Sequence, residues 1–164
     1  MMQLTMPKDI KSIVIASHND GKVREIRSLL DPYGYKIISA KKLGINEPIE
    51  NGMTFSENSL IKSRNAAKKS GLVALADDSG LCVNSLNYRP GIYSARWAGK
   101  NKDFGMAMKK IQKLMEKNDL LSKYNRRAFF VCSLSVYFPD GKNKVFNGRV
   151  NGHLQFPPKG LNGF

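Results

Sequence analysis

The sequence predicts an α/β fold, in which helices cover a β-sheet. Two observations lead to this class. Short apolar runs alternate with segments of helical periodicity, and they do so at both ends of the chain. The 164 residues, 41% of them hydrophobic, are also enough to bury a substantial core. We therefore expect one domain over residues 1–164.

The first strand and helix are predicted near the N-terminus. Ile13–Ala16 is a short apolar run that is typical of a buried strand. After residues 17–22, one helical face collects the apolar side chains of Val23, Ile26, Leu29 and Leu30. The Asp-Pro-Tyr-Gly sequence at 31–34 ends this helix, and Tyr35–Ile38 is a candidate second strand.

A second helix and two further strands are expected in the middle of the chain. Thr54 offers a helix N-cap, and Glu57 completes a capping box three residues later. This helix should run to about Lys69 and stop at Gly71. The apolar run 72–76 then predicts a buried strand, and residues 81–86 predict another.

The last part of the chain predicts a helix followed by a hairpin. Asp103 is a candidate N-cap, and the helix after it has an apolar stripe. Residues 128–138 are rich in aromatic and β-branched side chains, which favour a strand. A Pro-Asp-Gly-Lys turn at 139–142 leads to a partner strand at 144–150, so we expect a β-hairpin.

Two adjacent carboxylates, Asp77 and Asp78, follow the predicted strand 72–76. Functional sites of α/β proteins are usually built at such strand ends. Neighbouring negative charges repel unless protons or a cation lie between them, and Mg²⁺ is often shared between carboxylates and substrate phosphates. However, Asp, Ser and Gly are also common in turns. This segment alone is equally compatible with a metal site and with a solvated turn.

The Ser-His-Asn-Asp-Gly-Lys segment at 17–22 connects a predicted strand to a predicted helix. Backbone N–H groups at a helix N-terminus suit phosphate oxygens, and Lys22 adds a positive charge. The glycine spacing is not that of a Walker loop. From these residues alone, an ordinary cap by Asn19 or Asp20 is somewhat favoured, and His18 receives no catalytic role.

Three further charged residues are candidates for a site. Glu50 lies in a Pro-Ile-Glu-Asn-Gly loop, from which it can reach a metal. Lys62, on the second helix, either meets a phosphate or faces solvent. Arg96 follows a Pro-Gly turn and can bind a phosphate through two bonds, but a surface loop that packs Tyr93 and Trp97 explains it equally well.

The overall charge favours anionic partners without choosing among them. The chain has 27 basic and 13 acidic residues, which gives a net charge of +14. Nucleic acid, an anionic membrane surface and nucleotides all fit such a field. Two cysteines are too few for a disulfide framework or a zinc site. Neither a membrane span nor a signal peptide is visible, so we expect a cytoplasmic enzyme or binding protein.

Taken in order, these motifs resemble the inosine triphosphate pyrophosphatase family. They are Ser-x-Asn-x-x-Lys at 17–22, Phe-x-Glu-Asn at 55–58 with Lys62, Asp-Asp-Ser-Gly at 77–80, and Pro-Gly-x-Tyr-Ser at 90–94. Each motif is weak alone, but the ordered set is strong. The likeness runs from Ile13 to the Gly-Phe pair at 163–164.

The resemblance implies an enzyme that removes non-standard purine nucleotides from the nucleotide pool. It would hydrolyse dITP, ITP, XTP and dXTP to the monophosphate and pyrophosphate, with Mg²⁺ as cofactor. Asp78 matches the catalytic carboxylate and metal ligand, Asp77 is its catalytic partner, and Glu50 matches a second metal ligand. The expected substrate-binding residues are Ser17, His18, Asn19, Asp20, Gly21, Lys22, Lys62, Ser79, Arg96 and Phe164.

The resemblance also implies a mixed, elongated central sheet flanked by helices, with two lobes and a nucleotide cleft between them. A homodimer is expected, with no membrane association and no stable nucleic-acid partner. In the family, the Gly-Phe pair continues into Phe-Gly-Tyr-Asp and later Ser-His-Arg, which contact the base. Because this sequence ends at Phe164, we expect it to lack that base-recognition segment.

Three alternatives remain open at this point. A Maf-type nucleotide pyrophosphatase has a related fold, but its first loop has a Ser-x-Ser-x-Arg pattern, unlike the loop with Asn19 and Lys22. An inactive truncated fragment is the second alternative. A basic nucleic-acid-binding protein is the third, and its one hint is Arg126-Arg127 before two phenylalanines.

Overall fold

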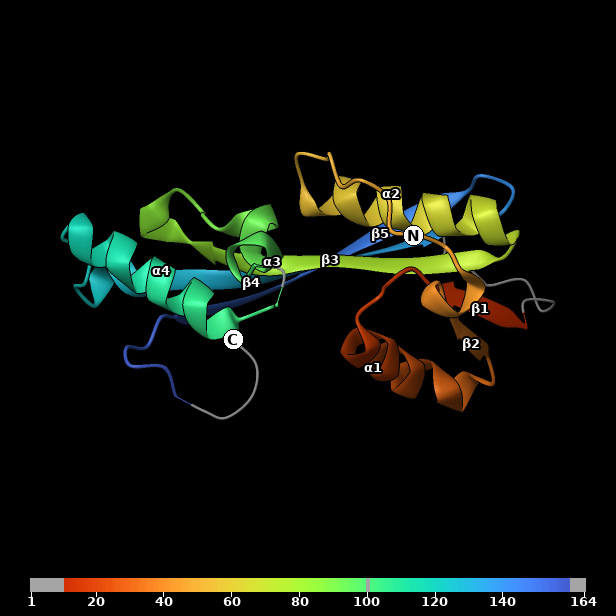
Figure 1. Cartoon of the computed structure of the whole chain (residues 1–164), viewed down its shortest axis with the longest axis horizontal. Helices are drawn as coiled ribbons and strands as arrows, with labels where there is room; N and C mark the ends of the chain where they lie inside the picture. Colours follow the sequence, from red (N-terminus) through yellow and green to blue (C-terminus); the bar gives the residue numbers. More distant parts are fainter. Residues whose placement is uncertain (1–10, 100, 160–164) are drawn as a thin grey trace, which may run out of the picture. The chain divides into compact units, whose positions relative to one another are not determined.

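The computed structural model describes residues 11–99 and 101–159 (Figure 1). Its packing divides the chain into two compact units. Unit 1 comprises Met1–Asp77 and Ser133–Phe146, and unit 2 comprises Asp78–Cys132 and Asn147–Phe164. Each unit is therefore discontinuous in sequence. One domain over residues 1–164 stays a prediction.

Within the described residues, five strands form one mixed sheet in the order β2-β1-β3-β4-β5. Their bounds are β1 Ser12–Ile15, β2 Lys36–Ser39, β3 Val73–Val83, β4 Arg127–Tyr137 and β5 Asn143–His153. Strand β1 pairs in parallel with both β2 and β3. A tight turn joins β4 to its sheet neighbour β5, so these two form the predicted hairpin. The predicted mixed sheet with flanking helices is confirmed.

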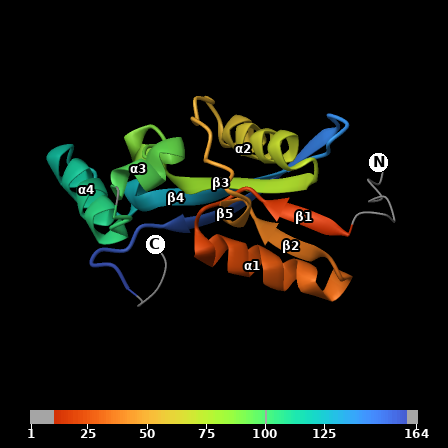
Figure 2. The same ribbon diagram turned by 45° about the vertical axis from the view of Figure 1, so that its right-hand side comes forward.

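In unit 1, two helices cover opposite faces of the sheet (Figure 2). They are α1 (Asp20–Leu30) and α2 (Phe55–Ser70). Ile13 and Ile15 of β1 pack with Val23 of α1. Val14 and Ala74, whose side chains point the other way, pack with small alanines of α2. This division follows from the alternation of side chains along a strand.

The predicted caps of α2 are confirmed. The Thr54 hydroxyl accepts a hydrogen bond from the backbone N–H of Glu57 (3.1 Å), and the Glu57 carboxylate accepts one from that of Met53 (2.6 Å). The helix ends at Gly71, whose φ of 68° lies in the left-handed region that glycine adopts most easily.

Unit 2 contains the short helix α3 (Ser94–Trp97) and the longer α4 (Phe104–Lys117). The Asp103 carboxylate caps α4, as predicted, by accepting from the backbone N–H of Met106 at 3.0 Å. A separate core forms where Ile111 and Met115 of α4 pack with Val83 and Ala128. Short 3₁₀ turns occur in both units, at Asp31–Tyr33, Lys41–Leu43, Asn84–Leu86, Gly91–Tyr93 and Tyr124–Arg126. Across residues 11–99 and 101–159, no helix combines the length and apolar character needed to cross a bilayer.

The sequence analysis was wrong about the backbone around the two carboxylates. Strands were predicted at 72–76 and 81–86 with polar residues between them, but β3 runs without a break through Val73–Val83. The reason lies in contacts distant in sequence. A Cβ atom on Gly80 would lie 2.5 Å from both the Gly91 carbonyl oxygen and the Ser94 hydroxyl, so this turn-forming residue instead permits a close approach to an extended strand.

Candidate functional site

The extended backbone of β3 directs Asp77 and Asp78 to opposite faces of the strand. Asp77 shares a face with Val73 and Leu75, whereas Asp78 follows the alternation of Ala74 and Ala76. Both residues are nearly buried, with 9% and 8% of their surface exposed. The strand geometry thus separates the two neighbouring carboxylates.

Lys22 of α1 forms an ion pair with Asp77. Its Nζ atom lies 2.5 Å from Oδ2 of Asp77, although the two residues are 55 positions apart in sequence. The topology explains the pairing, because β1 is the parallel neighbour of β3 and leads directly into α1. The predicted strand-to-helix loop therefore does meet the acidic segment, beside the carboxyl end of β1.

The loop 17–22 is organised by Asn19, which caps α1. Its Oδ1 atom accepts from the backbone N–H groups of Gly21 (2.9 Å) and Lys22 (3.4 Å). The hydroxyl of Ser17 accepts from the N–H of Asn19 at 3.1 Å. These N–H groups are engaged within the loop, so the cap that the sequence favoured is present. Asp20 is exposed, 3.5 Å from the ammonium of Lys41.

A second acid–base pair joins Glu50 to Lys62 of α2. The Lys62 ammonium lies 3.0 Å from Oε1 of Glu50, and the Lys62 side chain is only 11% exposed. Lys62 therefore does not face solvent. The structure places it beside Glu50, which was predicted to hold a metal, and the predicted contact of Lys62 with a phosphate stays a prediction.

Asn58 anchors the loop that carries Glu50, a role that the sequence analysis missed. Its side-chain oxygen accepts from the backbone N–H of Gly52 at 2.9 Å, and the residue is fully buried. Gly52 lies so close that a Cβ atom there would be 2.7 Å from Asn58 Oδ1. The Glu-Asn pair at 57–58 could have indicated this anchor, because it comes a few residues after the loop that carries Glu50.

Two buried serines, also missed, support the strand next to Asp77. Ser135 of β4 donates a hydrogen bond to the hydroxyl of Ser63 on α2 at 2.8 Å, and its oxygen lies 3.4 Å from the carbonyl of Ala76. Both serines are fully buried. The serines inside the otherwise apolar run 128–138 could have indicated buried hydrogen bonds.

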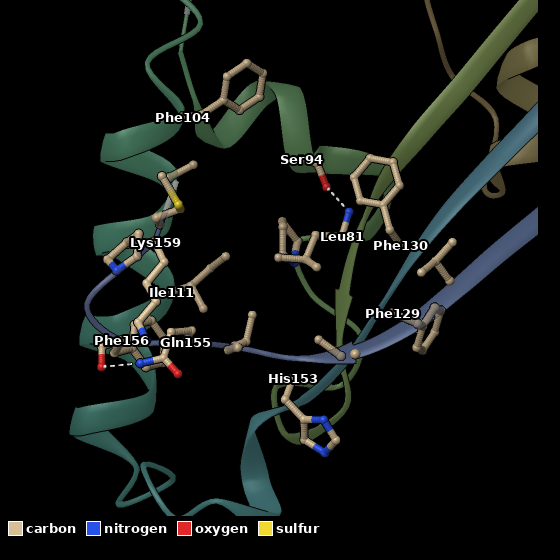
Figure 3. A pocket seen from close by; sticks show the side chains of 18 of the residues that line it. Leu81, Ser94, Phe104, Ile111, Phe129, Phe130, His153, Gln155, Phe156 and Lys159 are labelled. Carbon is tan, nitrogen blue, oxygen red and sulfur yellow. Dashed lines mark hydrogen bonds between the residues drawn. The ribbon is translucent and has the colours of Figure 1, made fainter. Parts of the chain in front are cut away.

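In unit 2, Ser94 links the Pro-Gly-x-Tyr-Ser motif to the part of β3 that follows Asp78 and Ser79. Its hydroxyl accepts from the backbone N–H of Leu81 at 3.0 Å and donates to the carbonyl of Gly91 at 2.7 Å. Figure 3 shows the first of these bonds. The motif therefore has a structural function in holding β3, besides any contact with a ligand.

Arg96 is exposed, with its guanidinium carbon 4.9 Å from the centre of the Tyr93 ring. The structure thus shows the surface packing that the sequence analysis gave as one of two interpretations. Phe164 lies outside the described residues. Glu50, Lys22, Lys62 and Asp77 all belong to unit 1.

Comparison with known proteins identifies the family. The profile of the Ham1 family matches residues 13–164, which is nearly the whole chain. The chain belongs to the Ham1 family. This result confirms the resemblance inferred from the ordered motifs, because Ham1 relatives carry the name of the expected activity.

Curated Ham1 relatives include the dITP/XTP pyrophosphatase of Zymomonas mobilis, 54% identical over 93% of this chain and 72% of that protein. The dITP/XTP pyrophosphatase of Rhodopseudomonas palustris is 49% identical over the same shares. Among solved structures, a HAM1 protein from Coxiella burnetii superposes with a TM-score of 0.83 at 37% identity, covering 93% of this chain and 77% of that one. The Staphylococcus aureus Ham1 protein gives a TM-score of 0.78 at 42% identity, covering 94% and 77%.

This Ham1 chain also has an apolar pocket of about 340 Å³ within unit 2 (Figure 3). Helix α4 supplies one wall, and the end of β5 with the segment after it supplies another. Polar groups are few, and those labelled in Figure 3 are Ser94, His153, Gln155 and Lys159. The sequence analysis did not predict this pocket, because its aromatic residues were interpreted as strand core.

Proposed function

We propose that this Ham1 protein hydrolyses dITP, ITP, XTP and dXTP to the nucleoside monophosphate and pyrophosphate. Two findings support the proposal. Ham1 relatives named dITP/XTP pyrophosphatase are up to 54% identical over 93% of the chain. The single structural observation that carries it is the pairing of Lys22 with Asp77 and of Lys62 with Glu50 in unit 1.

Such pairs suit a substrate that brings both positive and negative charge. A metal-bound triphosphate offers anionic oxygens to the two lysines and a cation to the carboxylates. Lys22 and Lys62 would stabilise the charge that develops on the leaving pyrophosphate. In this proposal, the positive end of the α1 dipole also favours the anionic substrate.

Asp78 is the proposed general base. A carboxylate within hydrogen-bond reach of water can orient it or remove its proton as the phosphorus–oxygen bond forms. Asp77, held by Lys22, is the supporting partner in this proposal.

The donor set fits Mg²⁺, with Glu50 and Asp78 as the proposed protein ligands. Both offer the hard carboxylate oxygens that this ion prefers. Among the described residues, no group of three or more His, Cys, Asp or Glu side chains could hold a metal. Mg²⁺ usually takes one or two carboxylates and completes its shell with water and substrate phosphates, so the proposal needs only two protein ligands. When bound, the ion would neutralise phosphate charge.

A cytoplasmic homodimer belongs to the same proposal and stays a prediction. The nucleic-acid alternative gains no support from the basic residues of unit 2, because several of them stack on the protein's own aromatic rings. The Arg149 guanidinium lies 3.6 Å from the centre of the Phe129 ring, and the Lys110 ammonium lies 4.3 Å from that of Trp97.

Product analysis tests the proposal. The purified chain is incubated with dITP, XTP and dGTP, with Mg²⁺ or with EDTA, and nucleotides and phosphates are separated by ion exchange. We expect monophosphate and pyrophosphate from dITP and XTP, much less from dGTP, and none with EDTA. Release of orthophosphate and a diphosphate instead would contradict the proposed cleavage between the α and β phosphates.

A further inference from the structure

His18 links two loops of unit 1 that carry different parts of the site. Its ring Nε2 atom lies 2.8 Å from the carbonyl oxygen of Ile45. Because a carbonyl only accepts, the ring must donate from Nε2. The backbone N–H of the same residue donates to Oε1 of Glu47 at 3.2 Å. One residue of the 17–22 loop thus holds the 45–48 segment at two points.

The two linked segments lead to the two acid–base pairs. Beyond His18, the first loop enters α1 and delivers Lys22 to Asp77. Beyond Glu47, the second leads to Glu50, which meets Lys62. The anchor on the second loop is firm, because Ile45 is buried and its N–H donates to the carbonyl of Ala40 at 3.0 Å. Movement of His18 is therefore restrained relative to a fixed point in the core.

We infer that His18 is a positioning residue, which fixes the phosphate-binding loop relative to the loop that carries Glu50. The inference rests on the proposed function for the chemistry of the two loops. The half-buried ring is turned to a backbone carbonyl, so it serves the site through the backbone. Loss of preorganisation in groups that hold a substrate lowers its affinity.

A nearby contact supplies a matched control. The side-chain amide of Asn65 on α2 donates to the carbonyl of Asn46 at 3.1 Å. It holds the same segment as His18 but ties it to α2 instead of to the 17–22 loop. Loss of the Asn65 bond therefore tests general anchoring of the segment, whereas loss of the His18 ring bond tests the link between the loops.

Three variants of the full chain test the inference: His18→Leu, His18→Gln and Asn65→Leu. Glutamine can place an amide nitrogen near the position of Nε2, so it should restore the bond. We measure kcat and KM for dITP, the affinity for inorganic tripolyphosphate by calorimetry in EDTA, and the thermal unfolding midpoint. Should His18→Leu fail to fold, His18→Ala replaces it.

His18→Leu should raise KM and weaken tripolyphosphate binding by the same factor, about three- to tenfold, which is what one hydrogen bond is worth. Its kcat should change by less than about twofold, because no reacting group is removed. His18→Gln and Asn65→Leu should resemble the wild type. Unchanged tripolyphosphate affinity in His18→Leu, an equal loss in Asn65→Leu, or no rescue by glutamine would overturn the inference.

Failure of the proposed function gives a different result. If the wild type releases no pyrophosphate from dITP, yet His18→Leu weakens tripolyphosphate binding and glutamine restores it, the activity is wrong and the positioning role stands.

Discussion

The ammonium of Lys22 lies 2.5 Å from the carboxylate of Asp77, joining the start of α1 to the middle of β3. The Asp77 side chain is 10% exposed and that of Lys22 is 35% exposed. A nearly buried carboxylate thus has a cation beside it that the proposed substrate would also attract. The structure holds the second lysine, Lys62, in the same way against Glu50.

Removal of the first lysine should affect both stability and binding. Lys22→Met removes the ion pair between Lys22 and Asp77, and we expect a loss of about 1–2 kcal/mol in the free energy of unfolding, between the values for exposed and buried pairs. Tripolyphosphate affinity should fall as well. Urea unfolding and calorimetry measure the two effects. Lys68→Met, an exposed position on α2, is the control and should change neither; a wild-type affinity in Lys22→Met would exclude the lysine from phosphate binding.

Removal of the second lysine should act mainly on catalysis. Lys62→Met withdraws a charge that the proposed mechanism places beside the leaving pyrophosphate, so kcat/KM for dITP should fall by about 10²–10³-fold. Lys68→Met again provides the comparison on the same helix. If Lys62→Met loses no more activity than Lys68→Met, Lys62 serves only its ion pair with Glu50.

Metal dependence should shift when Glu50 is neutralised. EDTA should abolish pyrophosphate release, and Mg²⁺ should restore it. In Glu50→Gln, we expect the Mg²⁺ concentration for half-maximal rate to rise by about tenfold, within the range seen when metal-site groups are changed. The rate is measured against Mg²⁺ at fixed dITP. An unchanged Mg²⁺ requirement would remove Glu50 from the proposed ligands.

The extended course of β3 depends on Gly80. Gly80→Ala would place a methyl group 2.5 Å from the Gly91 carbonyl and the Ser94 hydroxyl, so unfolding should become easier by about 1–3 kcal/mol. Gly152→Ala is the matched variant, since nothing lies within 4 Å of a Cβ at that position. Urea unfolding midpoints compare the two, and equal midpoints would contradict the close approach.

The two thiols should differ in reactivity. Burial raises the pKa of the Cys82 thiol, although Arg149 opposes this, and Cys132 is exposed. The thiolate is the reactive form, so iodoacetamide at pH 8 should label Cys132 in the native protein and leave Cys82 intact. A Cys132→Ser variant should incorporate label only when unfolded. Rapid native labelling of that variant would contradict the burial.

The raised pKa of Cys82 also makes the stability of the protein depend on pH. Because the folded-state pKa of Cys82 is raised, its contribution is fully present below the ordinary thiol pKa. It is lost as the pH rises through the folded-state value, so Cys82 makes the protein less stable at alkaline pH. The Cys82→Ala variant should lose part of the alkaline decrease that wild-type unfolding curves show.

Local signals predicted the helices well. Thr54, Glu57 and Gly71 mark the ends of α2 because capping depends on neighbours in sequence. The course of β3 was missed, since the turn preferences of Asp, Ser and Gly are overridden by the approach of Ser94, which lies 14 residues from Gly80. Asn58 and Ser135 were missed because their partners come from other elements.

The acidic candidates could be named from the sequence, but their separation could not. Neighbouring positions suggested a shared cation, whereas the strand sends Asp77 and Asp78 to opposite faces. In that arrangement Lys22 pairs with Asp77.

The central claim is that Asp78 performs the chemistry and Asp77 supports it. Pyrophosphate release from dITP at saturating Mg²⁺, compared among the wild type, Asp78→Asn and Asp77→Asn, tests it most directly. We predict a loss of about 10²–10⁴-fold in kcat for Asp78→Asn, which is what a general base contributes, and a smaller loss for Asp77→Asn. A wild-type rate in Asp78→Asn, or a larger loss in Asp77→Asn, would contradict the assignment.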